Sequence, residues 1–488
     1  MPMRRTLLSL GAVALLALSG CASLPGEGAG GLPRVWTQLG PEGEVSLRAI
    51  VAAHENCPLA EVDRSIQPMH WRARPGGGQG DAANPAFDPP FAVAACELIL
   101  PPGAREVRVA GQAVALPVAS PQRIVVLGDT GCRIKVPAKG NGDPIQDCTD
   151  PQAWPWADIA AAAAATRPDL VIHVGDYHYR EVCDDPERCQ PLRDKGVVVT
   201  YGWAGWNADF FKPAAPLLAA APWVFVRGNH ENCDRAGEGW MRFLSPLPYV
   251  ACANQRFRSA SRSVLGNNFT AEAYRIPLSP ELALVVADNS GHEDYRPASA
   301  TPEDVATFEQ TLKVLQAAPV DQKIWLLSHK PVWYDLLGPA VQPNAFQTVL
   351  KRTVPANLQV SFAGHQHAFA TYNFAPASDP QYLAGRPAQV IVGGGGTQLE
   401  SLDPQSPFFE GRGAAGSKER MRPDGRTYDG VAAQSGILLN RYSFLVLERD
   451  AEGWAGRVLD TQGGLISRCR LSGGGKEMAC SFPGQPAN

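Results

Sequence analysis

Five short apolar segments, each followed directly by polar residues, dominate the hydrophobic pattern of the chain. They are rich in Val, Ile and Leu and span residues 124–127, 170–174, 223–226, 324–327 and 358–362. Short apolar runs of this kind are typical of strands buried on both faces. The polar residues behind them are therefore expected at the C-terminal ends of strands, the edge where open α/β sheets bind ligands.

Helical patterns alternate with these strands. Residues 156–166 are rich in Ala, and residues 207–220 have helical character around Pro213. Thr301 and Pro302 form a helix start, because Thr is a favourable N-cap and Pro fits the first turn. Strands that alternate with helices predict an α/β fold with parallel strand order.

Further segments extend this pattern. Residues 282–287 predict another buried strand, and residues 442–447 and 455–459 predict a hairpin that completes a sheet. Two long inserts, 181–206 and 400–436, interrupt the order of strands and helices. Inserts of this length are uncommon unless they carry function or lack fixed structure.

The N-terminal region has a different pattern. Residues 1–20 combine basic residues with an apolar stretch too short to span a bilayer, which predicts a secretory signal peptide. This segment is followed by Cys21, and residues 18–21 resemble a bacterial lipoprotein box, which implies a lipid on the Cys21 thiol. The alternative is an ordinary signal peptide with a Cys there by chance. Ala22 favours the outer membrane, by resemblance to Gram-negative lipoproteins.

The remaining chain divides into three expected parts. Residues 21–33 are rich in Gly and Pro and predict a linker. Alternating apolar residues between Gly/Pro breaks predict a small β domain over residues 34–118, in the form of a sandwich. The α/β domain then covers residues 119–488.

Charge and cysteine content narrow the function classes. The net charge is −4 without basic clusters, which argues against nucleic-acid binding. Ten of the eleven Cys remain beyond Cys21, an even number that predicts disulfides in an exported chain. Proximity suggests the pairs Cys132/Cys148, Cys183/Cys189, Cys233/Cys252 and Cys469/Cys480, which leaves Cys57/Cys96. The chain has no Cys-x-x-Cys, so a zinc-thiolate site is not expected.

Seven potential metal ligands follow the five strands. They are Asp129, Asp176, Tyr179, Asn229, His329, His365 and His367. Carboxylate and imidazole together suit zinc, iron and manganese. Seven donors are too many for one tetrahedral ion. They make two sites of four ligands each if Asp176 binds both ions. Two ions about 4 Å apart suit in-line displacement at phosphorus, so the pattern predicts a dinuclear site for phosphate-ester chemistry.

The motifs around these donors resemble those of the calcineurin-like metallophosphoesterases and, more narrowly, of purple acid phosphatases. They lie in the order of the family and read Gly128-Asp129-Thr130-Gly131, Gly175-Asp176-Tyr177-His178-Tyr179, Gly228-Asn229-His230-Glu231, Ser328-His329 and Gly364-His365-Gln366-His367. The wider superfamily has His at the place of Gly131, whereas here Tyr179 adds a donor. The resemblance implies a β-sandwich core flanked by helices.

The resemblance also implies roles for these residues. Asp129, Asp176, Tyr179 and His367 would hold one ion, expected to be ferric iron, and Asp176, Asn229, His329 and His365 would hold divalent zinc, iron or manganese. A metal-bound hydroxide would attack phosphorus. His230 would stabilise the phosphoryl oxygens or protonate the leaving group, and Glu231 would orient His230. The alternative for Tyr179 is a buried side chain whose hydroxyl bonds a carboxylate.

Several neighbouring residues have open interpretations. His178 lies within the second motif and is a candidate for substrate contact, with a structural or surface role as the alternative. Lys330 either pairs with phosphate or is solvated, and residues 288–290 end a strand and are candidates to support the site. The glycines 393–396 lack the Gly-Lys-Ser/Thr ending of a nucleotide loop, which favours close backbone packing over a phosphate cradle.

The expected activity is hydrolysis of small phosphate monoesters, as in acid phosphatases. A phosphodiesterase or nucleotidase on the same metals is the first alternative, because loops rather than the metal motifs set the substrate. A non-catalytic binding lipoprotein on the same fold is the second. The complete ligand set argues against this second alternative.

Overall fold

The structure is a computed structural model. It describes residues 34–76, 91–134, 145–181, 186–252, 272–291, 302–333, 345–350, 354–374, 386–400, 419–420, 433–472 and 474–484. The predicted signal peptide, Cys21 and the linker lie outside these residues, as does most of the predicted insert 400–436.

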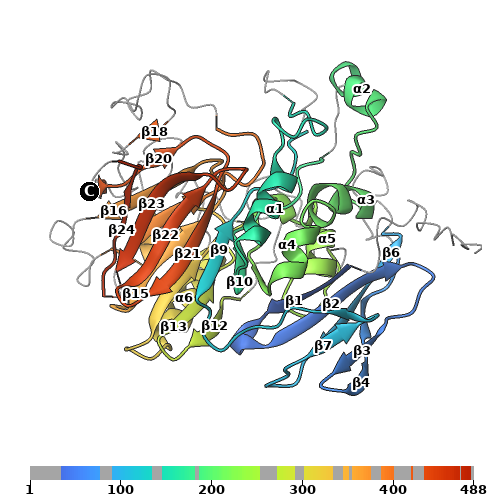
Figure 1. Ribbon diagram of the computed structural model, residues 1–488, viewed down its shortest axis with the longest axis horizontal. Coiled ribbons are helices and arrows are strands. Elements are labelled where there is room, and N and C mark those ends of the chain that lie inside the picture. Colours follow the sequence, from blue (N-terminus) through green and yellow to red (C-terminus); the bar gives the residue numbers. More distant parts are fainter. Residues whose placement is uncertain are drawn as a thin grey trace, which may run out of the picture.

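Two large sheets form the centre of the molecule (Figure 1). In the described ranges, the first has 11 strands in the order β24-β23-β22-β21-β9-β10-β11-β1-β2-β6-β5. They are β1 (Arg34–Leu39), β2 (Val45–Ala52), β5 (His70–Ala73), β6 (Val93–Ile99), β9 (Arg123–Leu127), β10 (Leu170–His173), β11 (Trp223–Phe225), β21 (Phe444–Asp450), β22 (Gly453–Leu459), β23 (Leu465–Ser472) and β24 (Met478–Ser481). Strands β9, β10 and β11 are parallel, as their apolar runs predicted. The hairpin β21–β22 is confirmed and joins β9 in antiparallel pairing.

The second sheet has nine strands in the described part of the chain. They are β12 (Tyr274–Ser279), β13 (Leu282–Val286), β14 (Lys323–Leu327), β15 (Leu358–Ala363), β16 (Phe369–Phe374), β17 (Ala388–Val392), β18 (Glu419–Arg420), β19 (Ala433–Ser435) and β20 (Leu438–Leu439). Strands β13, β14, β15 and β17 are parallel neighbours. The predicted parallel strands are thus divided between two sheets.

Helices connect the strands. The main ones are α1 (Trp156–Ala165), α2 (Pro186–Asp194), α3 (Trp203–Trp206), the π-helix η3 (Asn207–Phe211), α4 (Ala215–Ala220), α5 (Gly237–Gly239), the π-helix η5 (Trp240–Leu244), α6 (Pro302–Gln316) and α7 (Ala345–Leu350), with short turns η2 (Pro41–Gly43) and η4 (Asn229–Glu231). The helices predicted over 156–166 and 207–220 are confirmed, the second with a break around Pro213. Helix α6 begins at Pro302, and its predicted cap Thr301 lies outside the described residues.

The layers follow from the period of two along each strand. Ile124 and Val126 of β9 point into the core between the sheets. Val125 and Leu127 point the other way and pack with helices α1 and α4. Helices α6 and α7 cover the outer face of the second sheet, where Phe308 and Phe346 are buried in a third core. The order helix, sheet, sheet, helix confirms the expected sandwich core flanked by helices.

The N-terminal strands continue the first sheet. Strand β1 pairs in parallel with β11, with Gln38 opposite Trp223. Strands β3 (Leu59–Val62), β4 (Ser65–Pro68), β7 (Val107–Val109) and β8 (Gln112–Ala113) form a separate four-stranded sheet. This sheet packs on β2 and β6 through a small apolar core, so the segment has a sandwich form of its own. Its status as a separate domain stays a prediction.

Four predicted disulfides are present in the described residues. They are Cys57–Cys96, Cys132–Cys148, Cys233–Cys252 and Cys469–Cys480. Cys189 is also disulfide-bonded, and its predicted partner Cys183 lies outside the described residues. These disulfides indicate an oxidising compartment, outside the cytosol.

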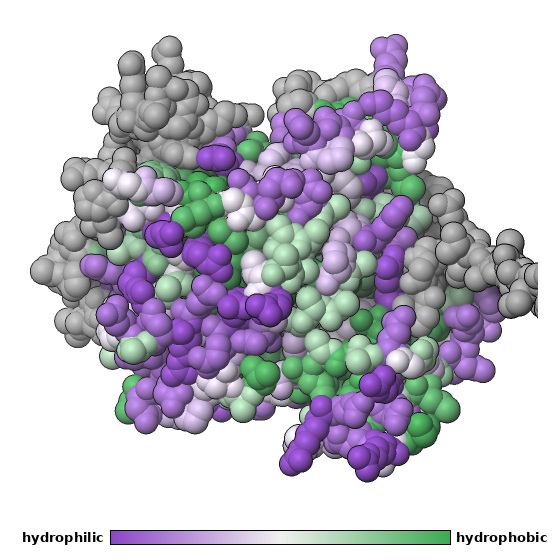
Figure 2. All heavy atoms as spheres, in the orientation of Figure 1, coloured by the Kyte–Doolittle hydropathy of each residue, from purple (hydrophilic) through white to green (hydrophobic). Residues whose placement is uncertain are grey.

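The surface is of mixed polarity. Hydrophilic residues spread over β21–β23 on the face in Figure 2, where alternate side chains of β22 and β23 face outward. Among the described helices, none has the length and apolar character needed to cross a bilayer.

Candidate functional site

The loops that follow β9, β10, β11, β14 and β15 bring all seven predicted donors together. Three of them have left-handed backbone conformations that L-residues seldom adopt: Asp129 at φ 57°, Asp176 at 61° and His365 at 70°. Each such residue costs about 1–2 kcal/mol. Backbone strain of this kind persists where the surrounding contacts hold the residue in place, and strained residues cluster at functional sites.

One group of donors surrounds the phenol of Tyr179. The hydroxyl donates to Asp176 Oδ2 at 2.6 Å and lies 2.9 Å from His367 Nε2 and 3.3 Å from Asp129 Oδ1. His367 Nδ1 lies 2.8 Å from the carbonyl of Gln398, which fixes Nδ1 as the protonated nitrogen and leaves Nε2 with a lone pair that can coordinate a metal. The four donors assigned to the first ion are therefore within reach of one another.

A second group surrounds the side-chain oxygen of Asn229. Asn229 Oδ1 lies 2.9 Å from His365 Nδ1 and 3.1 Å from His329 Nε2. His329 Nε2 is 3.2 Å from Asp176 Oδ2, while its Nδ1 donates to the carbonyl of Val174 at 2.8 Å. Ligand atoms of Asp176, His329 and His365 all lie within 4.8 Å of one another. Asp176 thus takes part in both groups.

The electrostatics of the cluster favour bound cations. Burial, together with the carboxylates of Asp176 and Asp129, raises the pKa of Tyr179 well above its usual value. Burial and the charge of Asp176 also raise the pKa of Asp129. Ionisation of Asp129 and Tyr179 is therefore opposed, whereas for Asp176 burial is outweighed by the imidazoles of His329 and His230, which lower the pKa. A metal cation would favour the charged forms of all three groups. The donor set fits metal ions.

The change from His to Gly at position 131 has a steric reason. A Cβ on Gly131 would lie 2.7 Å from Tyr179 N, 2.8 Å from Tyr177 O and 2.9 Å from Tyr179 Cδ2. Such distances are shorter than real Cβ contacts, so a side chain at 131 and this loop path cannot coexist. The position of the Tyr179 ring therefore requires a residue without a Cβ at position 131.

We expected Glu231 to orient His230, but in the structure Glu231 bonds the backbone of two loops instead. Its two carboxylate oxygens accept four backbone N–H groups, from Asp176, Tyr177, His178 and Gly228, at 2.9–3.2 Å. A buried carboxylate needs such donors to offset its desolvation, and the loop amides supply them. Glu231 thus holds together the two loops that carry Asp176 and Asn229.

The carboxylate beside His230 belongs to Glu181, which the sequence did not indicate. His230 Nδ1 lies 2.5 Å from Glu181 Oε1, and Arg235 contacts both side chains. The Tyr179 ring packs on the other side of the imidazole, with centroids 3.7 Å apart. His230 Nε2 lies 2.8 Å from Arg235 Nη2 and 3.9 Å from Asp176 Oδ2. Glu181 and Arg235 belong to no motif of the resemblance, so only their positions reveal them.

His178 has a structural position. Its side chain is fully buried, its Nε2 lies 2.9 Å from the carbonyl of Thr200, and its ring is near those of Tyr201 and Trp206. Burial lowers its pKa, which favours a neutral imidazole. The expected substrate contact is therefore corrected, because this ring is enclosed by protein.

The glycines 393–396 pack behind the site, as predicted. Gly395 N donates to the carbonyl of Gly128 at 3.0 Å, and Thr397 N donates to that of Asp129 at 2.9 Å. The Gly-rich turn thus runs against the loop that carries Asp129. Close backbone contact explains its composition.

This geometry defines a metallophosphoesterase, and the comparisons agree. The family model for calcineurin-like phosphoesterase matches residues 122–369, just over half of the chain. The chain therefore belongs to the calcineurin-like phosphoesterase family, and it is a metal-dependent phosphoester hydrolase. The comparison with curated proteins found no match.

Several solved structures are similar to this chain. A purple acid phosphatase from yellow lupin (Lupinus luteus) seeds is similar with a TM-score of 0.51 at 16% identity, over 89% of this chain and 72% of that chain. PhoD is similar with a TM-score of 0.48 at 13% identity, over 95% and 94%. A dimetal phosphatase from Danio rerio has a TM-score of 0.35 at 12% identity, over 70% and 96%. The likeness to the lupin enzyme is one of fold.

Proposed function

We propose that this protein hydrolyses phosphate monoesters with a ferric ion and a divalent ion of zinc, iron or manganese. Asp129, Asp176, Tyr179 and His367 would hold the ferric ion, and Asp176, Asn229, His329 and His365 the divalent ion. The observation that carries the proposal is the place of the Tyr179 hydroxyl, within 3.3 Å of donor atoms on three other residues of the first group. An anionic oxygen donor in that place suits a trivalent cation.

The bound ions would supply Lewis acidity and lower the pKa of a coordinated water. The protein's own residues do the rest. His230 Nε2 lies 3.9 Å from Asp176 Oδ2 and 2.8 Å from Arg235 Nη2, and it would contact the phosphoryl or leaving-group oxygen. Glu181 bonds Nδ1 and keeps the ring in that orientation, in the way that a carboxylate orients a catalytic imidazole.

Metal analysis and turnover test the proposal on the same purified protein. We expect two ions per chain, a visible absorption band from the ferric phenolate, and faster turnover of a monoester such as p-nitrophenyl phosphate than of bis(p-nitrophenyl) phosphate. Preference for the diester would favour a phosphodiesterase on the same metals. Two bound ions without turnover of any ester would favour a binding protein.

We also propose that the protein is exported and anchored by a lipid on Cys21. The disulfides support export, because they form in oxidising compartments. We expect the wild-type protein in the outer-membrane fraction and its release by detergent. Cys21→Ser should abolish lipid attachment, and a wild-type protein confined to the soluble periplasmic fraction would contradict the anchor.

A further inference from the structure

The divalent-ion site draws its ligands from both sheets. Asn229 follows β11 of the first sheet, whereas His329 follows β14 of the second. Their donor atoms are 3.1 Å apart. The geometry of this site therefore depends on how the edges of the two sheets are held relative to one another.

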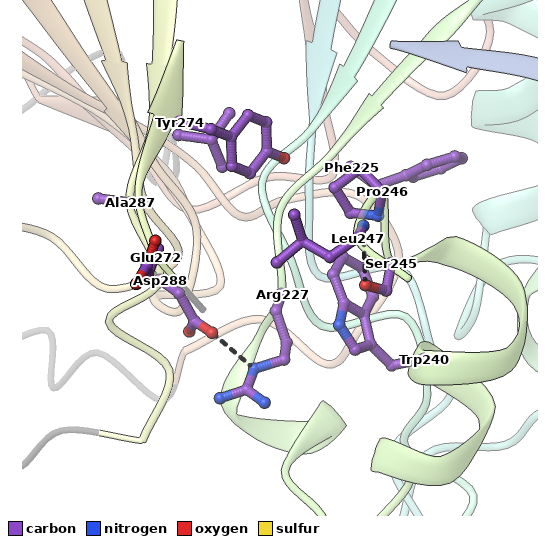
Figure 3. A pocket seen from close by; sticks show the side chains of 11 residues that line it. Phe225, Arg227, Trp240, Ser245, Pro246, Leu247, Glu272, Tyr274, Ala287 and Asp288 are labelled. Carbon is purple, nitrogen blue, oxygen red and sulfur yellow. Dashed lines mark hydrogen bonds and ion pairs between the residues drawn. The ribbon is translucent and has the colours of Figure 1, made fainter. Parts of the chain in front are cut away.

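A short segment at the end of β13, residues 288–290, contacts the loops of both ligands. On the side of the first sheet, Arg227 Nε lies 2.8 Å from Ser290 Oγ and 3.1 Å from Asp288 Oδ2. Arg227 stands two residues before Asn229. Figure 3 shows Arg227 and Asp288 extending toward one another from the segments that follow β11 and β13, beside a small cavity that Trp240 and Leu247 also line.

This contact is well defined because both partners are buried. The side chains of Arg227 and Asp288 are 2% and 6% exposed. Ser290 donates to Asp288 Oδ1 through its N–H at 3.1 Å and its hydroxyl at 2.7 Å, which fixes the carboxylate so that Oδ2 faces Arg227. A buried ion pair in which both partners also bond to Ser290 favours one geometry rather than a range.

On the side of the second sheet, the same segment grips the His329 loop. Asn289 Nδ2 donates to the carbonyl of Lys330 at 2.8 Å, and its Oδ1 accepts the N–H of Lys330 at 3.0 Å. Ser328 Oγ donates to the same carbonyl at 2.9 Å. The backbone on the C-terminal side of His329 is thus held by a side chain whose neighbours hold Arg227.

We propose that residues 288–290 form a bracket that sets the distance between the Asn229 and His329 loops, with Asn289 as a positioning residue for the divalent ion. The inference rests on the proposed dinuclear function. The bracket acts on the divalent ion, because residues 288–290 contact the loops of Asn229 and His329. Asp129 and Tyr179, which belong to the first ion, are held instead by backbone amides and Asp209.

Asn289→Ala tests the bracket, with Asn357→Ala as the matched control. Asn357 is similarly buried, and its amide donates to the carbonyls of Pro319 and Gln322 at 2.9 and 2.8 Å, at the opposite end of β14. Both variants lose a buried amide on the same sheet. They differ in distance from the metal cluster, because Asn289 bonds the residue after His329 and Asn357 lies at the other end of β14.

The enzyme loaded with iron at the first site is titrated with Zn²⁺ against a chromogenic chelator, and iron content and the visible band are followed in parallel. We expect Asn289→Ala to weaken Zn²⁺ binding about 10–100-fold, as loss of a partner behind a ligand does, with iron and the band retained. Asn289→Asp keeps the acceptor for Lys330 N–H and should lie between the wild type and Asn289→Ala. Asn357→Ala should bind Zn²⁺ like the wild type.

Three results would overturn the bracket: unchanged Zn²⁺ affinity in Asn289→Ala, an equal loss in Asn357→Ala, or parallel loss of iron and Zn²⁺. Asn289→Asp provides the same readout if Asn289→Ala does not fold. A wild type that fails to bind two ions is a separate result, because it removes the dinuclear function itself and the inference with it.

Discussion

The hydroxyl of Tyr179 donates to Oδ2 of Asp176 at 2.6 Å, and both residues are almost fully buried. A neutral phenol in this position donates a hydrogen bond to the carboxylate. A phenolate would repel it unless a cation lay between them. The contact therefore agrees with both interpretations of Tyr179, as a ligand and as a buried hydrogen-bond donor.

Tyr179→Phe separates these interpretations. Phe keeps the ring that packs on His230 and deletes only the oxygen, so the fold should be retained. A ferric phenolate absorbs in the visible range, and we expect the variant to lose that band while the iron-loaded wild type is coloured. A colourless iron-loaded wild type, or a band that survives the substitution, would make Tyr179 a hydrogen-bond donor only.

Gly131→Ala should destabilise the protein and disturb the first ion's site. The added Cβ would meet backbone atoms of Tyr177 and Tyr179, which cannot move aside like a flexible side chain. Overpacking of this kind costs about 1–3 kcal/mol. Urea unfolding measures the loss, and Gly474→Ala is the control because its Cβ would meet nothing within 4 Å. Equal stability of the two variants would refute the steric argument.

Glu181→Gln and Glu231→Gln should have different effects, the first on kcat and the second on metal content. Glu181→Gln weakens the hold on His230, so kcat should fall while both ions stay bound. His230→Ala should lower kcat by roughly 10²–10⁴-fold, which is the largest loss expected for Glu181→Gln. Glu231→Gln replaces an acceptor of four loop amides, so metal content should fall first. Metal analysis beside kcat distinguishes the two, and full activity of Glu181→Gln would contradict its role.

Glu97 should make stability depend on pH. Burial alone would raise its pKa, but Arg48 and Arg72 outweigh burial and lower it below the usual 4.5. Both arginines also donate to backbone carbonyls of the segment that ends η5, such as Ser245 O. Because the folded pKa is depressed, this stabilisation is present above about pH 4.5 and is lost as pH falls through the folded pKa.

Glu97→Gln should therefore lower the free energy of unfolding at pH 7 by about 3 kcal/mol, since it leaves two buried guanidinium groups without their carboxylate. Its stability should also change less than that of the wild type when the pH is lowered from 5 toward 3. Urea unfolding at pH 7, 5 and 3 measures both effects. A variant with the same stability and pH profile as the wild type would exclude this role.

The sequence by itself determined the ends of the strands and the chemistry placed there. The apolar runs before Asp129, Asp176, Asn229 and His329 are local patterns. Because these strands are buried on both faces, the runs can be recognised as strands without knowledge of their partners. The resemblance of the motifs to the family identified Gly131 in the place of a His, with Tyr179 as an added donor. The hairpin β21–β22 and helix α1 follow from local periodicity in the same way.

Only the tertiary structure decided which strands pair and which side chains meet. Local periodicity carries no information on partners, so the division into two sheets and the pairing of β1 with β11 depend on contacts between distant segments. Glu181 reaches His230 from a loop without a motif, and Asn289, which the sequence offered only as a candidate to support the site, reaches the His329 loop. Their roles depend on distance and burial in the folded chain, which residue types and spacing do not encode.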